Sequence, residues 1–141
     1  MKATARRTPS RAFTHRIDVR RHRLLVDEPR RKGGDDEGPT PQELLAASLA
    51  SCAAITIEMY VSRKGWDIGP LEVTCEYAPA ERGSPTVFRL VTRLSGGCSE
   101  AQAARLRLIA AKCPVRRILG GEVMFDERVE LLTPAGAAPD R

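Results

Sequence analysis

The stretch TPQELLAASLASCAAITIEMYVSRKG, residues 40–65, decides the fold of this chain. Thr40 is a good helix N-cap, Pro41 suits the first helical position, and Glu43 completes a capping box three residues after the cap. Gly65 is a typical stop signal at the other end. The stretch therefore predicts one helix over residues 41–64, about 36 Å long at a rise of 1.5 Å per residue.

The predicted helix is apolar or small on nearly every side, and it contains the longest uncharged run of the chain, residues 44–57. A helix that is apolar all round must be buried. A chain of 141 residues can scarcely surround it with its own elements, so we expect a second subunit to complete the burial. The uncharged run has fourteen residues, fewer than the roughly 18 that a membrane span needs, and no transmembrane segment is expected.

Short segments with strand or helix periodicity surround this helix. They predict a hairpin over residues 17–26, strands over 71–77 and 87–94, a helix capped by Ser99 and reaching Lys112, a short helix over 115–119 and a last strand over 122–132. The two middle strands alternate with period two, which predicts one buried and one exposed face for each. Pro114 ends the longer of these helices and starts the shorter one, so Cys113 stands at a helix start.

Positive charge is concentrated at the start of the chain. Residues 1–32 carry a net charge of +8, whereas residues 33–141 carry −3. We therefore expect a loosely packed basic arm over 1–13, a single domain over 14–132 and a flexible tail over 133–141. The mildly acidic body argues against a nucleic-acid-binding surface spread over the fold. Residues 1–16 lack the apolar core of a secretory signal, which favours a cytoplasmic protein; an organelle transit peptide is the open alternative.

The four cysteines are the candidate reactive residues: Cys52, Cys75, Cys98 and Cys113. They form no C-x-x-C pair, and both histidines lie far away in the basic segment, so no metal site is expected. In a chain without an export signal, such cysteines are catalytic or simply buried rather than a disulfide framework.

A cysteine reacts as the thiolate, which needs a positive charge nearby. Cys113 has the helix start that follows it, whose partial positive charge favours an anion. Cys52 lies in the middle of a helix and needs an arginine from elsewhere, for which Arg20, Arg21 and Arg23 are candidates. The alternative is that Cys52 is an ordinary small core residue, and composition does not choose between the two interpretations.

Several motifs together resemble the OsmC/Ohr family. They are GPTPQELL at 38–45, ASC at 50–52, RKGW at 63–66 and KCPV at 112–115, preceded by His22, DEP at 27–29 and GGD at 33–35. The similarity runs from about residue 14 to about residue 131. It implies an α+β fold: an intertwined homodimer in which antiparallel sheets surround a long buried central helix, with active sites between the subunits.

The resemblance also implies an activity, the thiol-dependent reduction of organic hydroperoxides in defence against oxidative stress. By position, Cys52 resembles the peroxidatic cysteine and Cys113 the resolving one. A lipoyl-type or thioredoxin-type dithiol would reduce the pair again, and no cofactor is implied. The sequence does not choose between the two reductants.

One position departs from the family pattern. Family members place a glutamate ten residues before the reactive cysteine, where it holds the activating arginine, but this chain has Gln42 there. Glu43, one residue later, either orients that arginine or serves the helix cap alone. We favour Arg23 over Arg20 and Arg21 as the activating residue.

Gln42 favours a second interpretation, a binding protein for small hydrophobic ligands with little peroxidase turnover. A third interpretation uses the basic arm on a nucleic acid or another anionic surface. The chain has only six aromatic residues and no stacking motif, which argues against this one.

Overall fold

The computed structural model of the protein describes residues 1–131. Its elements are β1 (Ala3–Arg7), β2 (His15–Val19), β3 (His22–Val26), the 3-10 helix η1 (Arg30–Lys32), α1 (Pro41–Lys64), β4 (Leu71–Ala78), β5 (Val87–Leu94), α2 (Glu100–Ala110) and α3 (Pro114–Leu119). Strands β1, β2 and β3 form one antiparallel sheet, and β4 and β5 form a second. The fold is thus mixed helix and sheet with antiparallel sheets.

The predicted central helix is confirmed with both of its ends. At the start of α1, Thr40 Oγ1 accepts a hydrogen bond from the backbone N–H of Glu43 (3.2 Å), and the Glu43 carboxylate accepts one from the backbone N–H of Thr40 (2.7 Å). Gly65 closes the helix in the left-handed conformation, at φ 63°. These local signals place Cys52 halfway along α1.

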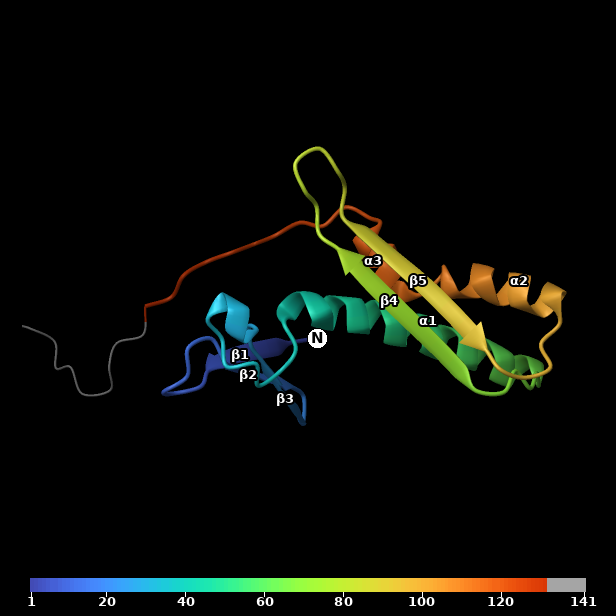
Figure 1. Cartoon of the computed structure of the whole chain (residues 1–141), viewed down its shortest axis with the longest axis horizontal. Coiled ribbons are helices and arrows are strands. Elements are labelled where there is room, and N and C mark those ends of the chain that lie inside the picture. Colours follow the sequence, from blue (N-terminus) through green and yellow to red (C-terminus); the bar gives the residue numbers. More distant parts are fainter. Residues whose placement is uncertain (132–141) are drawn as a thin grey trace, which may run out of the picture.

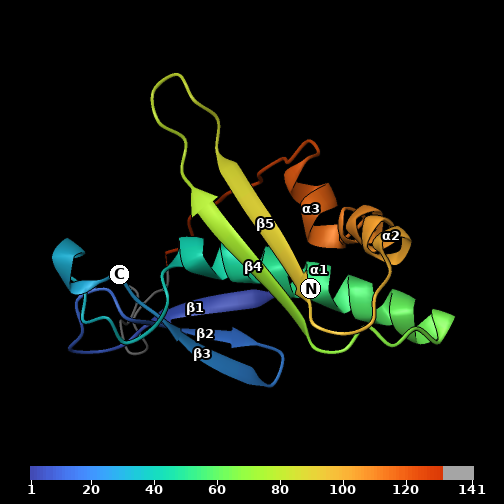
Figure 2. The same cartoon turned by 45° about the vertical axis from the view of Figure 1, so that its right-hand side comes forward.

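The other elements are arranged around α1. The β4–β5 hairpin lies across it, α2 and α3 lie beside the hairpin, and the three-stranded sheet lies near the first half of the helix (Figures 1 and 2). Residues from three segments form the core, where Ile57 of α1 meets Ile68 and Leu106. Strand β4 packs on α1, and its residues alternate between half-buried and exposed, as its period-two pattern predicts. Strand β5 does not show the expected alternation: residues 89–93 are all exposed, because a cavity borders the face of β5 that was expected to be buried.

One face of α1 stays open in the single chain. The buried side chains form a stripe at helical spacing: Ala46, Leu49, Ala53, Ile57 and Val61. On the open face, Ile55 is 54% exposed and Met59 is 56% exposed. By length and composition alone α1 could cross a membrane, but helices at the centre of water-soluble folds pass the same test, and its buried stripe serves the core here.

A buried carboxylate ties the first sheet to the loop before α1. Asp27 is 1% exposed and accepts hydrogen bonds from Thr14 Oγ1 (3.0 Å) and from the backbone N–H groups of Glu28 (2.8 Å), Asp35 and Glu37 (both 3.2 Å). Burial raises the pKa of Asp27, but these hydrogen bonds lower it more, so the pKa lies below its usual value. The loop that leads to α1 is thereby held against β3.

The two ends of the chain differ from the sequence-based expectation. The expected loose arm over 1–13 contains strand β1, because β2 offers it a free edge and Arg6 pairs with Asp18. The last strand expected over 122–132 is absent from its described part, residues 122–131. A strand needs an edge to pair with, and Phe125 and Val129 of this segment are 81% and 91% exposed. The expected tail over 133–141 lies outside the described residues.

Candidate active site

The structure brings two of the predicted site residues together, Cys52 and Cys113. Cys52 is half-buried in the middle of α1, and Cys113 is fully buried at the start of α3. A pocket of about 460 Å³ opens beside Cys52. It is lined by Ser48, Ser51, Cys52, Ile55, Thr56, Met59 and Arg63 of α1 and by Pro114 and Val115, which follow Cys113 in the chain.

Local structure explains where the Cys113 thiol lies. Pro114 takes the first position of α3, and Cys113 becomes its N-cap, with Sγ accepting a hydrogen bond from the backbone N–H of Arg116 (3.3 Å). Burial raises the pKa of Cys113, and the nearby Cys52 thiol raises it further, while the backbone N–H groups of Arg116 and Val115 lower it less. The helix start alone would favour a thiolate, but burial outweighs it. Cys113 therefore stays protonated at neutral pH.

The surroundings of Cys52 suit an apolar molecule. Ile55, Met59 and Val115 supply apolar walls, and Thr56 has its hydroxyl turned away to the backbone, since Oγ1 donates to the Cys52 carbonyl (2.7 Å). The wall residues Ile55 and Met59 belong to the exposed face of α1. Whatever covers that face would also close the pocket.

Sequence analysis missed one cation in this pocket, Arg63. Its Nε donates to the Met59 carbonyl (3.0 Å), and among residues 1–131 its side chain has no carboxylate partner. Arg63 follows Cys52 by eleven residues, and eleven steps of about 100° return to the same helix face. Helical periodicity could therefore have found it.

The expected activating arginines lie elsewhere in the single chain. Arg23 projects from β3 and pairs with Asp18 at 3.5 Å, with 75% of its side chain exposed. Arg20 and Arg21 lie at the exposed turn between β2 and β3. Within residues 1–131, none of these three arginines lines the Cys52 pocket.

Arg23 shares its carboxylate with other arginines. Arg6 and Arg16 also pair with Asp18, Arg16 at 3.1 Å. Burial raises the pKa of Asp18, but the hydrogen bond from Arg16 and the three positive charges lower it more, so the pKa lies below its usual value. Because Asp18 keeps two other partners, Arg23 can leave it at small cost.

Glu43 is placed in the capping box. Hydrogen bonds with Thr40 lower the pKa of Glu43 below its usual value, and the bond from the Thr40 backbone N–H has the largest effect. Gln42 is exposed and lines a separate cavity that also contains Cys75. Burial raises the pKa of the Cys75 thiol, which makes it a poor nucleophile at neutral pH.

The lowered pKa of Glu43 predicts how the fold responds to acid. The stabilisation is complete above the ordinary pKa of 4.5 and is lost as the pH falls through the lowered value, where the carboxylate takes up a proton. Glu43→Gln keeps a cap acceptor but cannot titrate. Its thermal midpoint should therefore fall less than that of the wild type between about pH 6 and about pH 3, measured by circular dichroism.

Thr40→Ala is the matched variant for this prediction. It removes the other half of the capping box and should lower the free energy of unfolding by about 1 kcal/mol at neutral pH. Equal acid sensitivity of Glu43→Gln and wild type would contradict a stabilising role for the carboxylate.

Comparison with known proteins places this arrangement in a family. The family model "OsmC-like protein" matches residues 34–128. Among curated proteins none matches this chain. The fold is similar to that of a putative osmotic stress induced and detoxification response protein from Psychrobacter arcticus 273-4, with 18% identity and a TM-score of 0.71 over 84% of this chain and 87% of that one.

Two further solved structures are similar. One is the organic hydroperoxide resistance protein OsmC from Legionella pneumophila, with 21% identity and a TM-score of 0.64 over 85% of this chain and 88% of that one. The other is an OsmC-like protein from Mycoplasma pneumoniae, with 19% identity and a TM-score of 0.67 over 85% and 86%. At these identities the likeness shows the fold. The family model covers more than half of the chain, and this protein therefore belongs to the OsmC-like family, in which solved relatives are named organic hydroperoxide resistance proteins.

Proposed function

We propose that this protein reduces organic hydroperoxides with Cys52 as the peroxidatic and Cys113 as the resolving cysteine. The observation that carries the proposal is the meeting of two helices at one pocket, which puts a half-exposed thiol next to a buried one. Family membership supports it, since relatives are named for hydroperoxide resistance.

The proposed cycle has three steps. The Cys52 thiolate attacks the distal oxygen of the hydroperoxide; the O–O bond breaks, the alcohol leaves with a proton, and Cys52 becomes a sulfenic acid. The Cys113 thiol then condenses with the sulfenic acid, which forms a disulfide and releases water. An external dithiol of the lipoyl or thioredoxin type takes up the oxidation and restores both thiols.

The two thiols differ in the way that this order of events requires. Cys113 is fully buried and stays protonated at neutral pH because burial raises its pKa. Cys52 opens to a pocket with apolar walls, where an alkyl or aryl hydroperoxide can enter. Peroxide therefore reaches Cys52 first. Since the cycle depends on reduced thiols, we place the protein in the cytoplasm.

We further propose that the working form is an intertwined homodimer with α1 buried at its centre. Leu45, Ile55 and Met59 lie exposed on α1 in the single chain. In residues 122–131 the apolar side chains Val123, Phe125, Val129 and Leu131 stand two or four places apart, on one side of an extended chain, yet each is at least half exposed. A second copy would bury both features, with this segment adding a strand to the partner's sheet.

In such a dimer the activating arginine comes from the other subunit. The Cys52 pocket lies on the face of α1 that a second copy would cover. We assign the role to the partner's Arg23, whose exposed guanidinium can exchange Asp18 for a thiolate. One close positive charge favours the charged form of the thiol.

The binding-protein alternative keeps one observation in its favour. Gln42 stands where the resemblance expects a carboxylate, and Glu43 is engaged in the helix cap. If no group orients an arginine toward Cys52, the same pocket would hold a ligand without turnover.

Counting thiols separates the two functions. The fully reduced protein is mixed with one equivalent of cumene hydroperoxide per chain, free thiols are titrated, and the peptides are mapped by mass spectrometry. We expect two of four thiols to disappear within minutes and a disulfide to join Cys52 to Cys113. Cys75 and Cys98 should stay reduced and serve as internal controls. If Cys52 remains reduced while cumene hydroperoxide or its alcohol binds, the peroxidase proposal is wrong and the binding function stands.

A further inference from the structure

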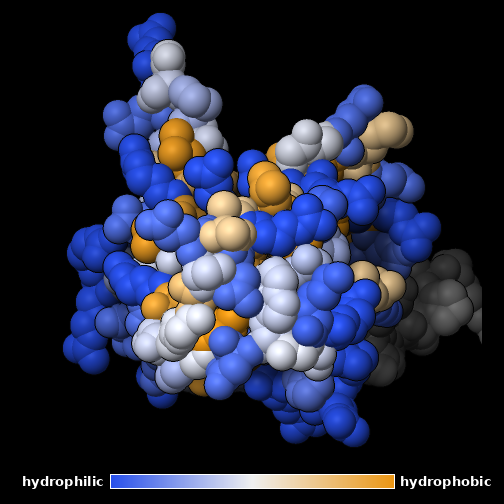
Figure 3. All heavy atoms as spheres, turned by 90° about the vertical axis from the view of Figure 1, so that its right-hand side faces the viewer, coloured by the Kyte–Doolittle hydropathy of each residue, from blue (hydrophilic) through white to orange (hydrophobic). Residues whose placement is uncertain are grey.

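A third cavity, the β5–α2 groove, lies apart from the Cys52 pocket and from the cavity lined by Gln42 and Cys75. It has a volume of about 740 Å³ and lies between strand β5 and helices α2 and α3. Its apolar walls are Leu49, Phe88, Leu90, Leu94, Leu106 and Leu119. No residue lines both this groove and the Cys52 pocket. In the space-filling view the surface is notched beside the β4–β5 hairpin, and hydrophobic residues show there among charged ones (Figure 3).

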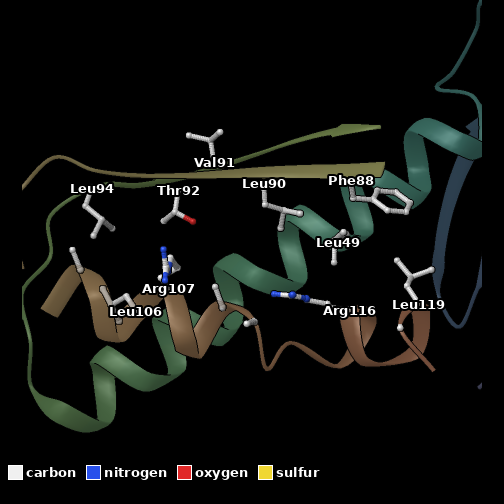
Figure 4. A pocket seen from close by; sticks show the side chains of 14 residues that line it. Leu49, Phe88, Leu90, Val91, Thr92, Leu94, Leu106, Arg107, Arg116 and Leu119 are labelled. Atoms are coloured by element: carbon white, nitrogen blue, oxygen red, sulfur yellow. The ribbon is translucent and has the colours of Figure 1, made fainter. Parts of the chain in front are cut away.

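Two guanidiniums enter the groove from different helices. Arg107 of α2 extends toward Thr92 on β5, and Arg116 of α3 lies across the space below Leu90 (Figure 4). Within residues 1–131 neither side chain forms a salt bridge. The salt bridges of Asp18, Glu28 and Glu37 lie in or near the first sheet, away from this groove. No carboxylate among residues 1–131 lines the groove, so these two exposed arginines give it a net positive charge.

The groove also has a direction. Arg107 lies beside Leu106 and Arg116 lies below Leu90, and Phe88 and Leu119 line the end of the groove beyond Arg116 (Figure 4). The segment of β5 from Phe88 to Leu94, which borders the groove, spans about 20 Å at 3.3 Å per residue. A ligand that fits must therefore carry an anionic head for the arginines and an apolar tail for the end of the groove.

We propose that the β5–α2 groove binds a carboxylate with a medium-length apolar tail, such as a medium-chain fatty acid. The carboxylate accepts hydrogen bonds from Arg107 and Arg116, and the tail lies against Phe88 and Leu119. Arginine is suited to this role because its planar fork holds a carboxylate through two parallel hydrogen bonds. The site is separate from the peroxide chemistry and does not require it.

A different occupant would also be anionic and apolar. Residues 122–131 of a second copy carry both acidic and apolar side chains. The test distinguishes this occupant from a small carboxylate. If a strand of the second copy fills the groove, replacing Arg107 or Arg116 should weaken the dimer, whereas no decanoate affinity should be present to change.

Titration calorimetry on the reduced full-length protein tests the proposal with three probes of equal tail length: decanoate, decanol and decyltrimethylammonium. We expect saturable binding of decanoate at one site per chain, at least about tenfold weaker binding of decanol, and no binding of the cation. Arg107→Gln and Arg116→Gln should each weaken decanoate binding about tenfold. Arg117→Gln is the matched control, since Arg117 is a neighbouring exposed arginine outside the groove lining.

Three results would overturn the proposal. One is equal affinity for decanoate and decanol, which would make the groove merely apolar. Another is unchanged decanoate affinity in Arg107→Gln and Arg116→Gln. The third is a loss of dimer in these two variants with no decanoate binding by the wild type, measured by sedimentation, which would assign the groove to the second copy. The outcome does not depend on Cys52, because no peroxide is present.

Discussion

Replacing Cys52 with serine is expected to abolish peroxide reduction, with a fall in rate of at least about 1000-fold. A serine hydroxyl is not ionised at neutral pH and cannot take up the distal oxygen, whereas a thiolate does so and becomes a sulfenic acid. The fold should persist, because Cys52 is half-buried and the two side chains differ by one atom. The rate is measured as loss of cumene hydroperoxide in the presence of a dithiol, with circular dichroism to check the fold.

Cys75→Ser is the matched control for this variant. Cys75 is also half-buried, and burial raises its pKa, so its loss should change the rate by less than about twofold. If Cys52→Ser kept a rate near that of the wild type, or if Cys75→Ser lost it, the assigned nucleophile would be wrong.

Arg23→Gln should slow peroxide reduction by at least about tenfold at pH 7, because it removes the positive charge that favours the Cys52 thiolate. The difference should shrink as the pH rises above the ordinary thiol pKa of about 8.5, where thiolate forms without help. The measurement is the rate of Cys52 oxidation by cumene hydroperoxide against pH. Arg21→Gln, at the exposed turn just before β3, is the control and should follow the wild-type profile.

Mixed dimers test whether this arginine acts across the interface. Alone, Cys52→Ser chains should be inactive and Arg23→Gln chains should keep at most about a tenth of the wild-type rate at pH 7, but a heterodimer of the two contains one site with both Cys52 and the partner's Arg23. After unfolding and refolding together, an equal mixture should regain about a quarter of the wild-type rate. Heterodimers that form but stay inactive would show that Arg23 does not act in trans.

Much of the fold follows from local sequence signals. The caps at Thr40 and Gly65 predict both ends of α1, and period-two alternation predicts the inward face of β4; the structure confirms these predictions. The same alternation in β5 does not predict its burial, because that depends on how closely α2 and α3 approach the strand. The short helix after Cys113 is likewise predicted, because Pro114 suits a first helical position. Hydrogen bonds over three or four residues and alternation along one strand depend on neighbours in the chain, so the sequence is enough to read them.

The candidate site was only partly predictable for the same reason. The two cysteine motifs mark Cys52 and Cys113, and the structure brings them together through the contact of α1 with α3. Arg63 was not predicted as a site residue, although helical periodicity places it on the same face of α1 as Cys52. Arg20, Arg21 and Arg23 are candidates for thiolate activation only because they are positively charged. Charge does not predict the strand register, and it is the register that places Arg23 next to Asp18.

By itself, the sequence determined the central helix, the two cysteine positions and the alternating faces of β4, since each depends on residues a few places apart. Tertiary structure alone decided three other features: the pairing of β1 in the basic arm, the unpaired course of residues 122–131 and the burial that keeps Cys113 protonated. Strand pairing needs an edge from a distant segment, and burial needs atoms from several elements. Neither is encoded in any short stretch of the chain.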